Sequence, residues 1–154
     1  MCYNFNYRNK LNGGIFVLKV EYVEKLNNEM ENLIDSEFEK HASKFGLKCN
    51  YKKFNFIAKV NGEIAGFITG VSLFESVHIN ELIVIEKYRG NNIGTELIKK
   101  VENYHSNKNF KYIELVTNKY QAPDFYKKCG FKLEFIRENK ENSKLTKYFF
   151  IKYF

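Results

Sequence analysis

Tryptophan is absent from the sequence, proline occurs once, and cysteine occurs three times. The three cysteines are widely spaced, at Cys2, Cys49 and Cys129, which favours neither a disulfide framework nor a zinc site. We therefore expect no metal and a reducing cytoplasm as the location. No apolar run approaches the roughly 20 residues of a membrane-spanning helix, and the N-terminus lacks the apolar segment of a signal peptide, so no membrane partner is expected.

Arginine is also scarce, although the chain carries a net charge of +7. The only arginines are Arg8, Arg89 and Arg137, so lysine provides almost all of the basic charge. Lysine is a point charge and lacks the planar fork that suits base recognition, and no aromatic-basic recognition motif is present. We expect no nucleic-acid partner; a nucleic-acid-binding domain would instead show strongly salt-dependent oligonucleotide binding.

Apolar residues are plentiful, at 44% of the chain, which is enough for a substantial core. The length of 154 residues predicts a single domain spanning residues 1–154. Residues 15–20 are predicted to form a strand, and apolar residues at helical spacing predict a helix over residues 21–44 with one face in the core. The other face is acidic, which is typical of a solvated helix face.

The middle of the chain predicts a mixed sheet. Alternating apolar residues on both sides of Asn61-Gly62 predict a hairpin with a type I′ turn. Successive apolar residues in 79–85 predict a strand buried on both faces. A helical pattern and a strand at 112–117 follow, so that 79–85 and 112–117 should be parallel neighbours. The predicted fold class is therefore α/β, with antiparallel N-terminal strands and a parallel central pair.

The last third of the chain predicts a short helix and two strands. Pro123 opens the sequence "PDFYKKCGF" and Gly130 closes it, as expected at the two ends of a helix. Residues 131–136 and 146–154 are predicted as an antiparallel pair. The aromatic strand "KYFFIKYF" either completes the sheet or pairs with a second copy at an exposed edge, which leaves a homodimer open.

The turn "RGNNIG", residues 89–94, lies between the central strand and its helix. The first N–H groups of a helix have no partner within the helix and the helix dipole is positive there, so the turn predicts a site for phosphates. No lysine follows Gly94, which excludes a P-loop. The glycine spacing is also wrong for the dinucleotide-binding fingerprint.

This turn and the segment "NKYQAPDFYKKCGFK" together resemble the acetyl-CoA-binding core of the GNAT superfamily of N-acetyltransferases. The resemblance covers residues 54–136 in the right order of elements. It departs at residue 92, where the family's first glycine is replaced by Asn92. Asparagine tolerates the left-handed backbone conformation better than most residues do, and we interpret Asn92 as a tolerated variant.

The resemblance implies a set of residues that bind acetyl-CoA. The pantetheine arm would lie along the central strand, where that strand splays from its parallel neighbour, at Leu82, Ile83 and Val84. Asn118, at the end of the neighbouring strand, matches a position that often touches the coenzyme. The pyrophosphate would be bound by the backbone N–H groups of Arg89, Gly90, Asn91, Asn92, Ile93, Gly94 and Thr95.

The resemblance also implies direct attack of a neutral amine on the thioester in a ternary complex. Tyr126 matches the tyrosine that protonates the departing sulfur. An N–H near Ile83 or Val84 would stabilise the oxyanion. Glu81 is our candidate for removing the amine's proton, directly or through water, and His78 is held in reserve because imidazole titrates near neutral pH.

The acceptor is expected to be a primary amine on a small molecule or a peptide. A cationic acceptor would be favoured by the carboxylates of the first predicted helix if they lay near the entrance. A different function stays open, that of a non-catalytic acyl-CoA-binding module. Asn92 favours that alternative, whereas the retention of Tyr126 speaks against it.

Overall fold

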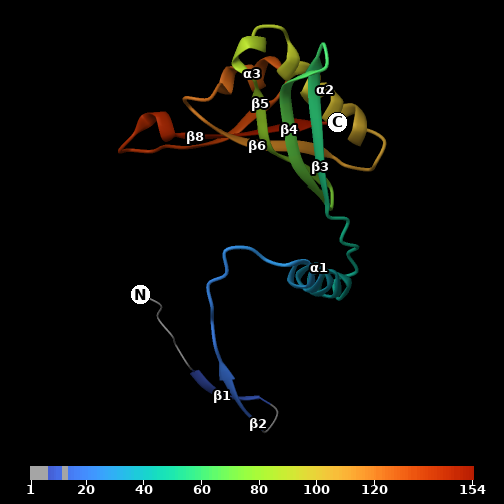
Figure 1. Cartoon of the computed structure of the whole chain (residues 1–154), viewed down its shortest axis with the longest axis vertical. Helices are drawn as coiled ribbons and strands as arrows, with labels where there is room; N and C mark the ends of the chain where they lie inside the picture. The colour runs from blue at the N-terminus through green and yellow to red at the C-terminus, as the bar shows by residue number, and fades with distance from the viewer. Residues whose placement is uncertain (1–6, 12–13) are drawn as a thin grey trace. The chain divides into compact units, whose positions relative to one another are not determined.

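The computed structural model describes residues 7–11 and 14–154 (Figure 1). Contacts within it divide the chain into an N-terminal unit, residues 1–47, and a C-terminal unit, residues 48–154. Each unit is described by itself. The single domain expected over residues 1–154 stays a prediction.

The N-terminal unit contains an antiparallel hairpin of β1 (Tyr7–Leu11) and β2 (Gly14–Leu18), followed by helix α1 (Asn28–Ser43). The expected helix start at residue 21 is wrong, because the Asn27 side chain accepts a hydrogen bond from the Met30 N–H at 2.9 Å and caps the helix there.

The apolar face of α1 was expected to lie in a core, and within this unit it does not. Ala42 is the one residue of α1 that is buried. Leu33 and Phe38 are 61% and 66% exposed. Within its own unit the helix therefore has the Asn27 cap and the ion pair Lys40–Glu37 in place of a core.

The C-terminal unit is built on a six-stranded sheet in the order β3-β4-β5-β6-β8-β7. Strands β5 and β6 are parallel and the other neighbours are antiparallel, which confirms the predicted mixed α/β sheet. The strands are β3 (Lys52–Val60), β4 (Glu63–Leu73), β5 (Ser76–Val84), β6 (Tyr112–Asn118), β7 (Lys132–Arg137) and β8 (Lys147–Tyr153).

Strand β8 has neighbours on both sides, which decides between the two roles considered for the aromatic C-terminal strand. It pairs with β6 along one edge and with β7 along the other. It therefore completes the sheet, and the idea that it offers an exposed edge to a second copy is wrong. A homodimer stays a prediction, but it would not form through an exposed edge of β8.

The predicted β3–β4 hairpin is confirmed. Asn61 and Gly62 have φ angles of 51° and 86°, the two positive values that a type I′ turn requires. The predicted helices are also present as α2 (Ile93–His105) and α3 (Pro123–Lys128). Both lie in the same unit as the sheet (Figure 1).

The core lies between α2 and one face of this sheet. Leu97, Ile98 and Val101 of α2 are at most 4% exposed. They belong to one cluster with Ile68 of β4 and Leu115 of β6. Because the side chains of a strand alternate between faces, the other face of the sheet carries the residues in between.

Strand β5 is paired differently along its length. It pairs with β4 as far as Val84, but with β6 only from Ser76 to Ile79. The predicted parallel pair and its splay are therefore confirmed. The predicted burial on both faces is wrong for the second half. Leu82 packs against the core cluster, whereas Ile83 lies on the opposite face of the sheet, where Ile57 is also exposed, and is 56% exposed.

Candidate active site

The turn that joins β5 to α2, residues 89–95, has the backbone shape expected for an anion site, and we call it the coenzyme turn. A 3-10 turn (Glu86–Tyr88) precedes it. Gly90 has a φ angle of 79°, which glycine adopts without strain. Asn92 is left-handed as well, with φ 59°, so it fulfils the conformation that the substituted glycine would provide.

The backbone N–H groups of residues 90–95 have no hydrogen-bond partner among the described residues. The first helical bond runs from the Glu96 N–H to the Asn92 carbonyl at 3.0 Å. One expected donor differs, because the Arg89 N–H donates to the Glu86 carbonyl at 3.1 Å and is already used by the 3-10 turn. The expected set of amide donors is thereby reduced to residues 90–95.

Side chains hold the coenzyme turn from outside. Arg89 Nε donates to the Val84 carbonyl at 3.1 Å, and Asn91 Nδ2 donates to the Tyr88 carbonyl at 3.1 Å. The carboxylate of Glu63, on the β3–β4 hairpin, accepts from Lys87 Nζ and Tyr88 OH at 2.6 Å each. These bonds lower the pKa of Glu63. The sequence contained no signal for Glu63, since it is 24 residues away from Lys87.

Gly94 is required for packing rather than for its backbone angle. A Cβ added there would lie 3.0 Å from the Phe125 ring of α3 and 3.7 Å from Val84. The coenzyme turn therefore lies directly against the helix that contains Tyr126.

The three β5 residues expected along the pantetheine arm lie in the half of the strand that β6 does not join. Leu82, Ile83 and Val84 pair with Ile68, Phe67 and Gly66 of β4, and their other side has no strand partner in the unit. Asn118 lies at the end of β6, where its N–H donates to Gln121 Oε1 at 2.8 Å. Gln121, which holds this strand end, was missed.

Tyr126 packs with its ring in the core and its hydroxyl at the surface. Its ring centroid is 5.1 Å from that of Phe125 and 6.0 Å from that of Phe131. Burial raises the pKa of Tyr126 to about 12, with a smaller contribution from Cys129. No buried polar side-chain atom among the described residues lacks a partner, and no bond to the Tyr126 hydroxyl is formed, so that oxygen reaches solvent.

Glu81 and His78 lie together on the opposite face of the sheet. They pair with Thr69 and Val71, two residues apart on β4, so they project to the same face despite the bulge between them. Glu81 Oε2 accepts from Thr69 Oγ1 at 2.9 Å, and His78 Nδ1 lies 3.8 Å from Glu114 Oε1. Tyr126 packs against the core face, at Phe150, so the expected acid and bases lie on different faces.

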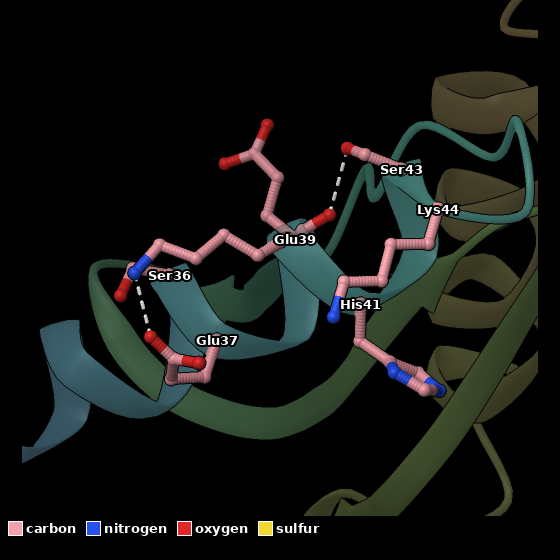
Figure 2. A pocket seen from close by; sticks show the side chains of 7 residues that line it. Ser36, Glu37, Glu39, His41, Ser43 and Lys44 are labelled. Carbon is pink, nitrogen blue, oxygen red and sulfur yellow. Dashed lines mark hydrogen bonds and ion pairs between the residues drawn. The ribbon is translucent and has the colours of Figure 1, made fainter.

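A surface hollow in the N-terminal unit contains none of the expected site residues. Figure 2 shows its lining, which comes from α1 and its C-cap between Ser36 and Lys44. The pair Lys40–Glu37, with Nζ and Oε1 2.6 Å apart, lies on its exposed surface. Because a single helix provides every lining residue, it cannot enclose a ligand.

The described part of the chain contains no group of three or more His, Cys, Asp or Glu side chains arranged to hold a metal ion. No helix of the described residues combines the length and the apolar character that crossing a membrane requires.

Comparisons with known proteins agree with this geometry. The model of the acetyltransferase (GNAT) family matches residues 21–131, so the chain belongs to that family. An uncharacterised N-acetyltransferase of Methanocaldococcus jannaschii is 32% identical over 90 residues, which are 56% of this chain and 58% of that protein. The chain therefore spans little more than half the length of this relative.

Solved structures share the fold. An acetyltransferase from Bacillus cereus is similar with a TM-score of 0.69 and 24% identity, over 87% of this chain and 98% of that one. A Bacillus anthracis protein solved in complex with acetyl coenzyme A has a TM-score of 0.62 and 22% identity, over 98% of this chain and 85% of that one.

Proposed function

We propose that this protein is an N-acetyltransferase that moves an acetyl group from acetyl-CoA to a primary amine by direct attack in a ternary complex. One observation carries the proposal: the unpaired amides of residues 90–95 stand at the end of β5, beside the half of that strand that β6 leaves. A diphosphate fits the unpaired amides, and an extended chain that contains amides fits the open half of the strand. Membership of the acetyltransferase (GNAT) family supports the same ligand.

The coenzyme would be held by backbone groups. The amides of residues 90–95 would bind the diphosphate, and Arg89 would act through its side chain, which supports the turn at Val84. Apart from the Val84 carbonyl, which accepts from Arg89, the free side of Leu82, Ile83 and Val84 offers strand hydrogen bonds to the pantetheine amides. Asn118 would contact the coenzyme from the end of β6.

Bound acetyl-CoA would supply a thioester; the acceptor nitrogen would add to its carbonyl carbon to give a tetrahedral oxyanion, and the carbon–sulfur bond would break when the carbonyl re-forms. Tyr126 would donate its phenolic proton to the departing sulfur. With a pKa of about 12, the phenol keeps its proton at neutral pH, as a donor must. The transfer is uphill against a free thiol of pKa about 8.5, but the same burial that disfavours phenolate would also disfavour thiolate.

The acceptor's proton would pass to Glu81, directly or through water, with His78 as the reserve. Both lie on the face opposite Tyr126, so an acyl group held where β5 and β6 diverge would be approached by the amine from one face and protonated at sulfur from the other. The oxyanion would be stabilised by a backbone N–H near Ile83 or Val84.

The acceptor we propose is cationic. Glu29, Glu31 and Asp35 are exposed on α1 in a chain whose net charge is +7, and such a local reversal attracts ammonium groups. Changing these three residues to their amides should raise the amine KM and leave kcat unchanged. An unchanged KM would indicate that this helix face is simply solvated and does not attract the amine. We also propose that the protein is located in the cytoplasm, as expected from its few, widely spaced cysteines.

Activity and binding can be separated experimentally. Isothermal titration with acetyl-CoA measures binding, and a thiol-reactive dye measures CoA release with a panel of amines. We expect micromolar to millimolar KM values, as is usual for enzymes. Binding without thiol release for any amine would favour the non-catalytic acyl-CoA-binding module, and the absence of binding would reject both functions.

A further inference from the structure

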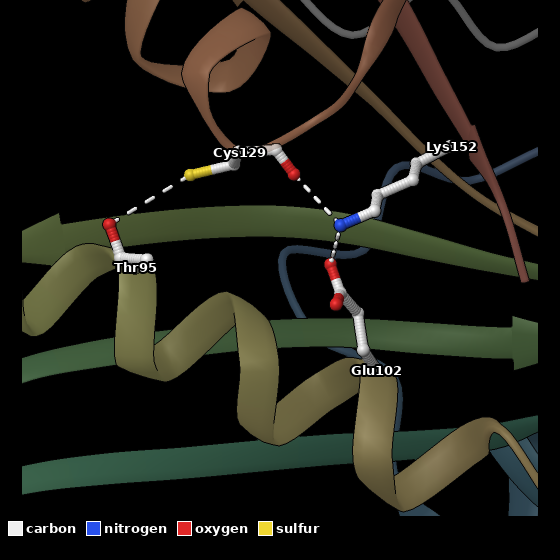
Figure 3. Close-up of polar contacts among 4 residues, drawn as sticks. All are labelled: Thr95, Glu102, Cys129 and Lys152. Atoms are coloured by element: carbon white, nitrogen blue, oxygen red, sulfur yellow. Dashed lines mark hydrogen bonds and ion pairs between the residues drawn. The ribbon is translucent and has the colours of Figure 1, made fainter.

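Lys152 of β8 joins the two helices of the C-terminal unit through a single ammonium group. Lys152 Nζ donates to Glu102 Oε1 of α2 at 2.5 Å and to the carbonyl of Cys129, the C-cap of α3, at 2.8 Å. Figure 3 shows both bonds. The three residues lie 23 and 50 positions apart in sequence, so three elements of the fold meet at this point.

The surroundings distinguish this contact from the other ion pairs. The side chains of Lys152 and Glu102 are 27% and 24% exposed, whereas those of Lys99 and Glu96, on the same helix α2, are 58% and 65% exposed. An exposed pair contributes little, but a largely buried pair keeps its geometry because water competes less well for its atoms. The stem of Lys152 also lies against Gly130, where an added Cβ would be 3.4 Å from it.

The Cys129 carbonyl, at the C-cap of α3, is not satisfied by the helix itself. The Gly130 N–H donates to the Lys127 carbonyl and the Phe131 N–H to the Tyr126 carbonyl, both at 3.0 Å, with Gly130 at φ 87°. This is a Schellman motif, which closes the helix but leaves the C-cap carbonyl free. The Lys152 ammonium donates a hydrogen bond to that carbonyl, which lies three residues after Tyr126.

Helix α2 and helix α3 also touch near the coenzyme turn. Thr95 Oγ1 lies 4.0 Å from Cys129 Sγ, as Figure 3 shows. Gly94 lies against the Phe125 ring. Thr95 belongs to the coenzyme turn and Tyr126 to α3, so the spacing between these two helices is the spacing between the proposed diphosphate site and the proposed proton donor.

We propose that Lys152 is a positioning residue, which holds the Cys129 carbonyl against Glu102 and so fixes Tyr126 relative to the coenzyme turn. This inference rests on the proposed function for its catalytic consequence. Its geometric part, that Lys152 fixes α3 on α2, can be measured without any activity, because the Cys129 thiol sits at the joint and is half-buried.

The test uses a protein in which Cys2→Ser and Cys49→Ser leave Cys129 as the single thiol. Lys152→Met removes the ammonium and keeps the stem. Lys152→Met with Glu102→Met also removes the carboxylate, so that no buried charge is left unpaired and folding is preserved. Lys152→Arg is the conservative rescue, and Lys99→Met is the matched control at an exposed pair of the same helix. Each variant is compared for melting temperature, iodoacetamide reaction at Cys129, acetyl-CoA Kd and kcat.

We expect the double variant to react about tenfold faster at Cys129. In Lys152→Met alone the gain should be smaller, because the Lys152 ammonium lowers the pKa of the Cys129 thiol and its loss disfavours the reactive thiolate. Both proteins should lose about 10- to 100-fold in kcat, with the acetyl-CoA Kd within about twofold. Lys99→Met should behave like the parent, and Lys152→Arg should restore most of the rate. The double variant carries the most weight, because its melting temperature should stay close to the parent value while its kcat stays low.

Lower melting temperatures with unchanged Cys129 reactivity and unchanged kcat would overturn the inference and make Lys152 purely structural. A loss of kcat that disappears in the double variant would overturn it too, since the ion pair alone would then matter. If the parent neither binds acetyl-CoA nor releases thiol, the proposed function fails, and the Cys129 reaction alone decides whether Lys152 fixes α3.

Discussion

The two halves of β5 differ more than their sequences suggest. From Ser76 to Ile79 the strand pairs on both sides, and Val77 and Ile79 are 0% and 3% exposed. From Glu81 to Val84 it pairs only with β4, and Ile83 is 56% exposed. Both halves are rich in β-branched residues, so the change lies in the neighbouring strand rather than in β5 itself.

The first half of β5 is therefore closed along both edges, whereas the second half has one open edge at the proposed site, although Leu82 still packs against the core. Loss of one row of strand partners leaves N–H and carbonyl groups free, which would be costly in a core but is useful beside a ligand that carries amides. The coenzyme turn follows the open half directly, and it too has unpaired donors.

Activity should depend on Tyr126 far more than stability does. We expect Tyr126→Phe to lower kcat by about 10²- to 10⁴-fold, because the ring still fills its place but no proton can be donated. The acetyl-CoA Kd and the melting temperature should stay near the parent values, since the hydroxyl bonds to no described residue. Thiol-release kinetics and calorimetry measure the two effects, and an unchanged kcat would remove Tyr126 from the proposed mechanism.

Stability should depend on Ile79, which lies in the closed half of β5 and faces the core, far more than on Ile83, which lies in the open half and faces the other side of the sheet. Ile79→Ala should lower the free energy of unfolding by about 2–5 kcal/mol, because it leaves a cavity in the core. Ile83→Ala, at an exposed position of the same strand, should change it by less than about 0.5 kcal/mol. Urea denaturation of both variants makes the comparison, and equal losses would contradict the division of the strand.

The coenzyme turn should be sensitive to a methyl group at Gly90. An added Cβ there meets no atom within 4 Å, so Gly90→Ala tests the backbone alone. Holding alanine at a positive φ costs about 1–2 kcal/mol, and relaxation of the turn would misplace the amides that follow. We expect acetyl-CoA affinity to fall about tenfold. Asn92→Gly is the control: it removes the side chain at a left-handed position, and affinity should stay equal or rise.

Acid should destabilise the closed half through His105. This side chain is 1% exposed, with its ring 5.0 Å from that of Phe54, which lies in register with Ile79 through β4. Burial lowers the pKa of His105; the Val101 carbonyl opposes that shift, and Lys108 adds to it. The unfolded chain, with a pKa near 6.5, therefore binds the proton first, so this contribution to stability is complete above pH 6.5 and is lost progressively below it.

The matching experiment follows urea denaturation between pH 8 and pH 5, a range chosen to span the usual histidine pKa of about 6.5. His105→Phe should show a smaller loss of stability on acidification than the parent does. His41→Phe, at an exposed position of α1, should keep the parent slope. If the stability of His105→Phe fell with pH as steeply as that of the parent, other groups would cause the acid sensitivity.

Local patterns in the sequence predicted the turns and helices that depend on interactions between residues close in sequence. The Asn61-Gly62 turn, the α2 helix and the short α3 helix with Gly130 at its end are all present. The α1 start was missed, although Asn27 followed by Glu29 and Glu31 is a capping signal that could have located it.

Other features depend on contacts that no local pattern encodes. The Arg89 N–H is used by a 3-10 turn that has no sequence signature. The open edge of β5 depends on where β6 diverges, and the insertion of β8 between β6 and β7 depends on the whole sheet. The Lys152–Glu102 contact joins residues 50 positions apart, beyond the reach of any periodicity.

The most direct test of the account observes the backbone amides of residues 89–95 by nuclear magnetic resonance during titration with CoA. We expect large shifts and slower hydrogen exchange at residues 90–95, while the Arg89 amide, already bonded to Glu86, should show little change in exchange. Amides in this segment that stay unperturbed while CoA binds elsewhere, or a protein that does not bind CoA, would contradict it.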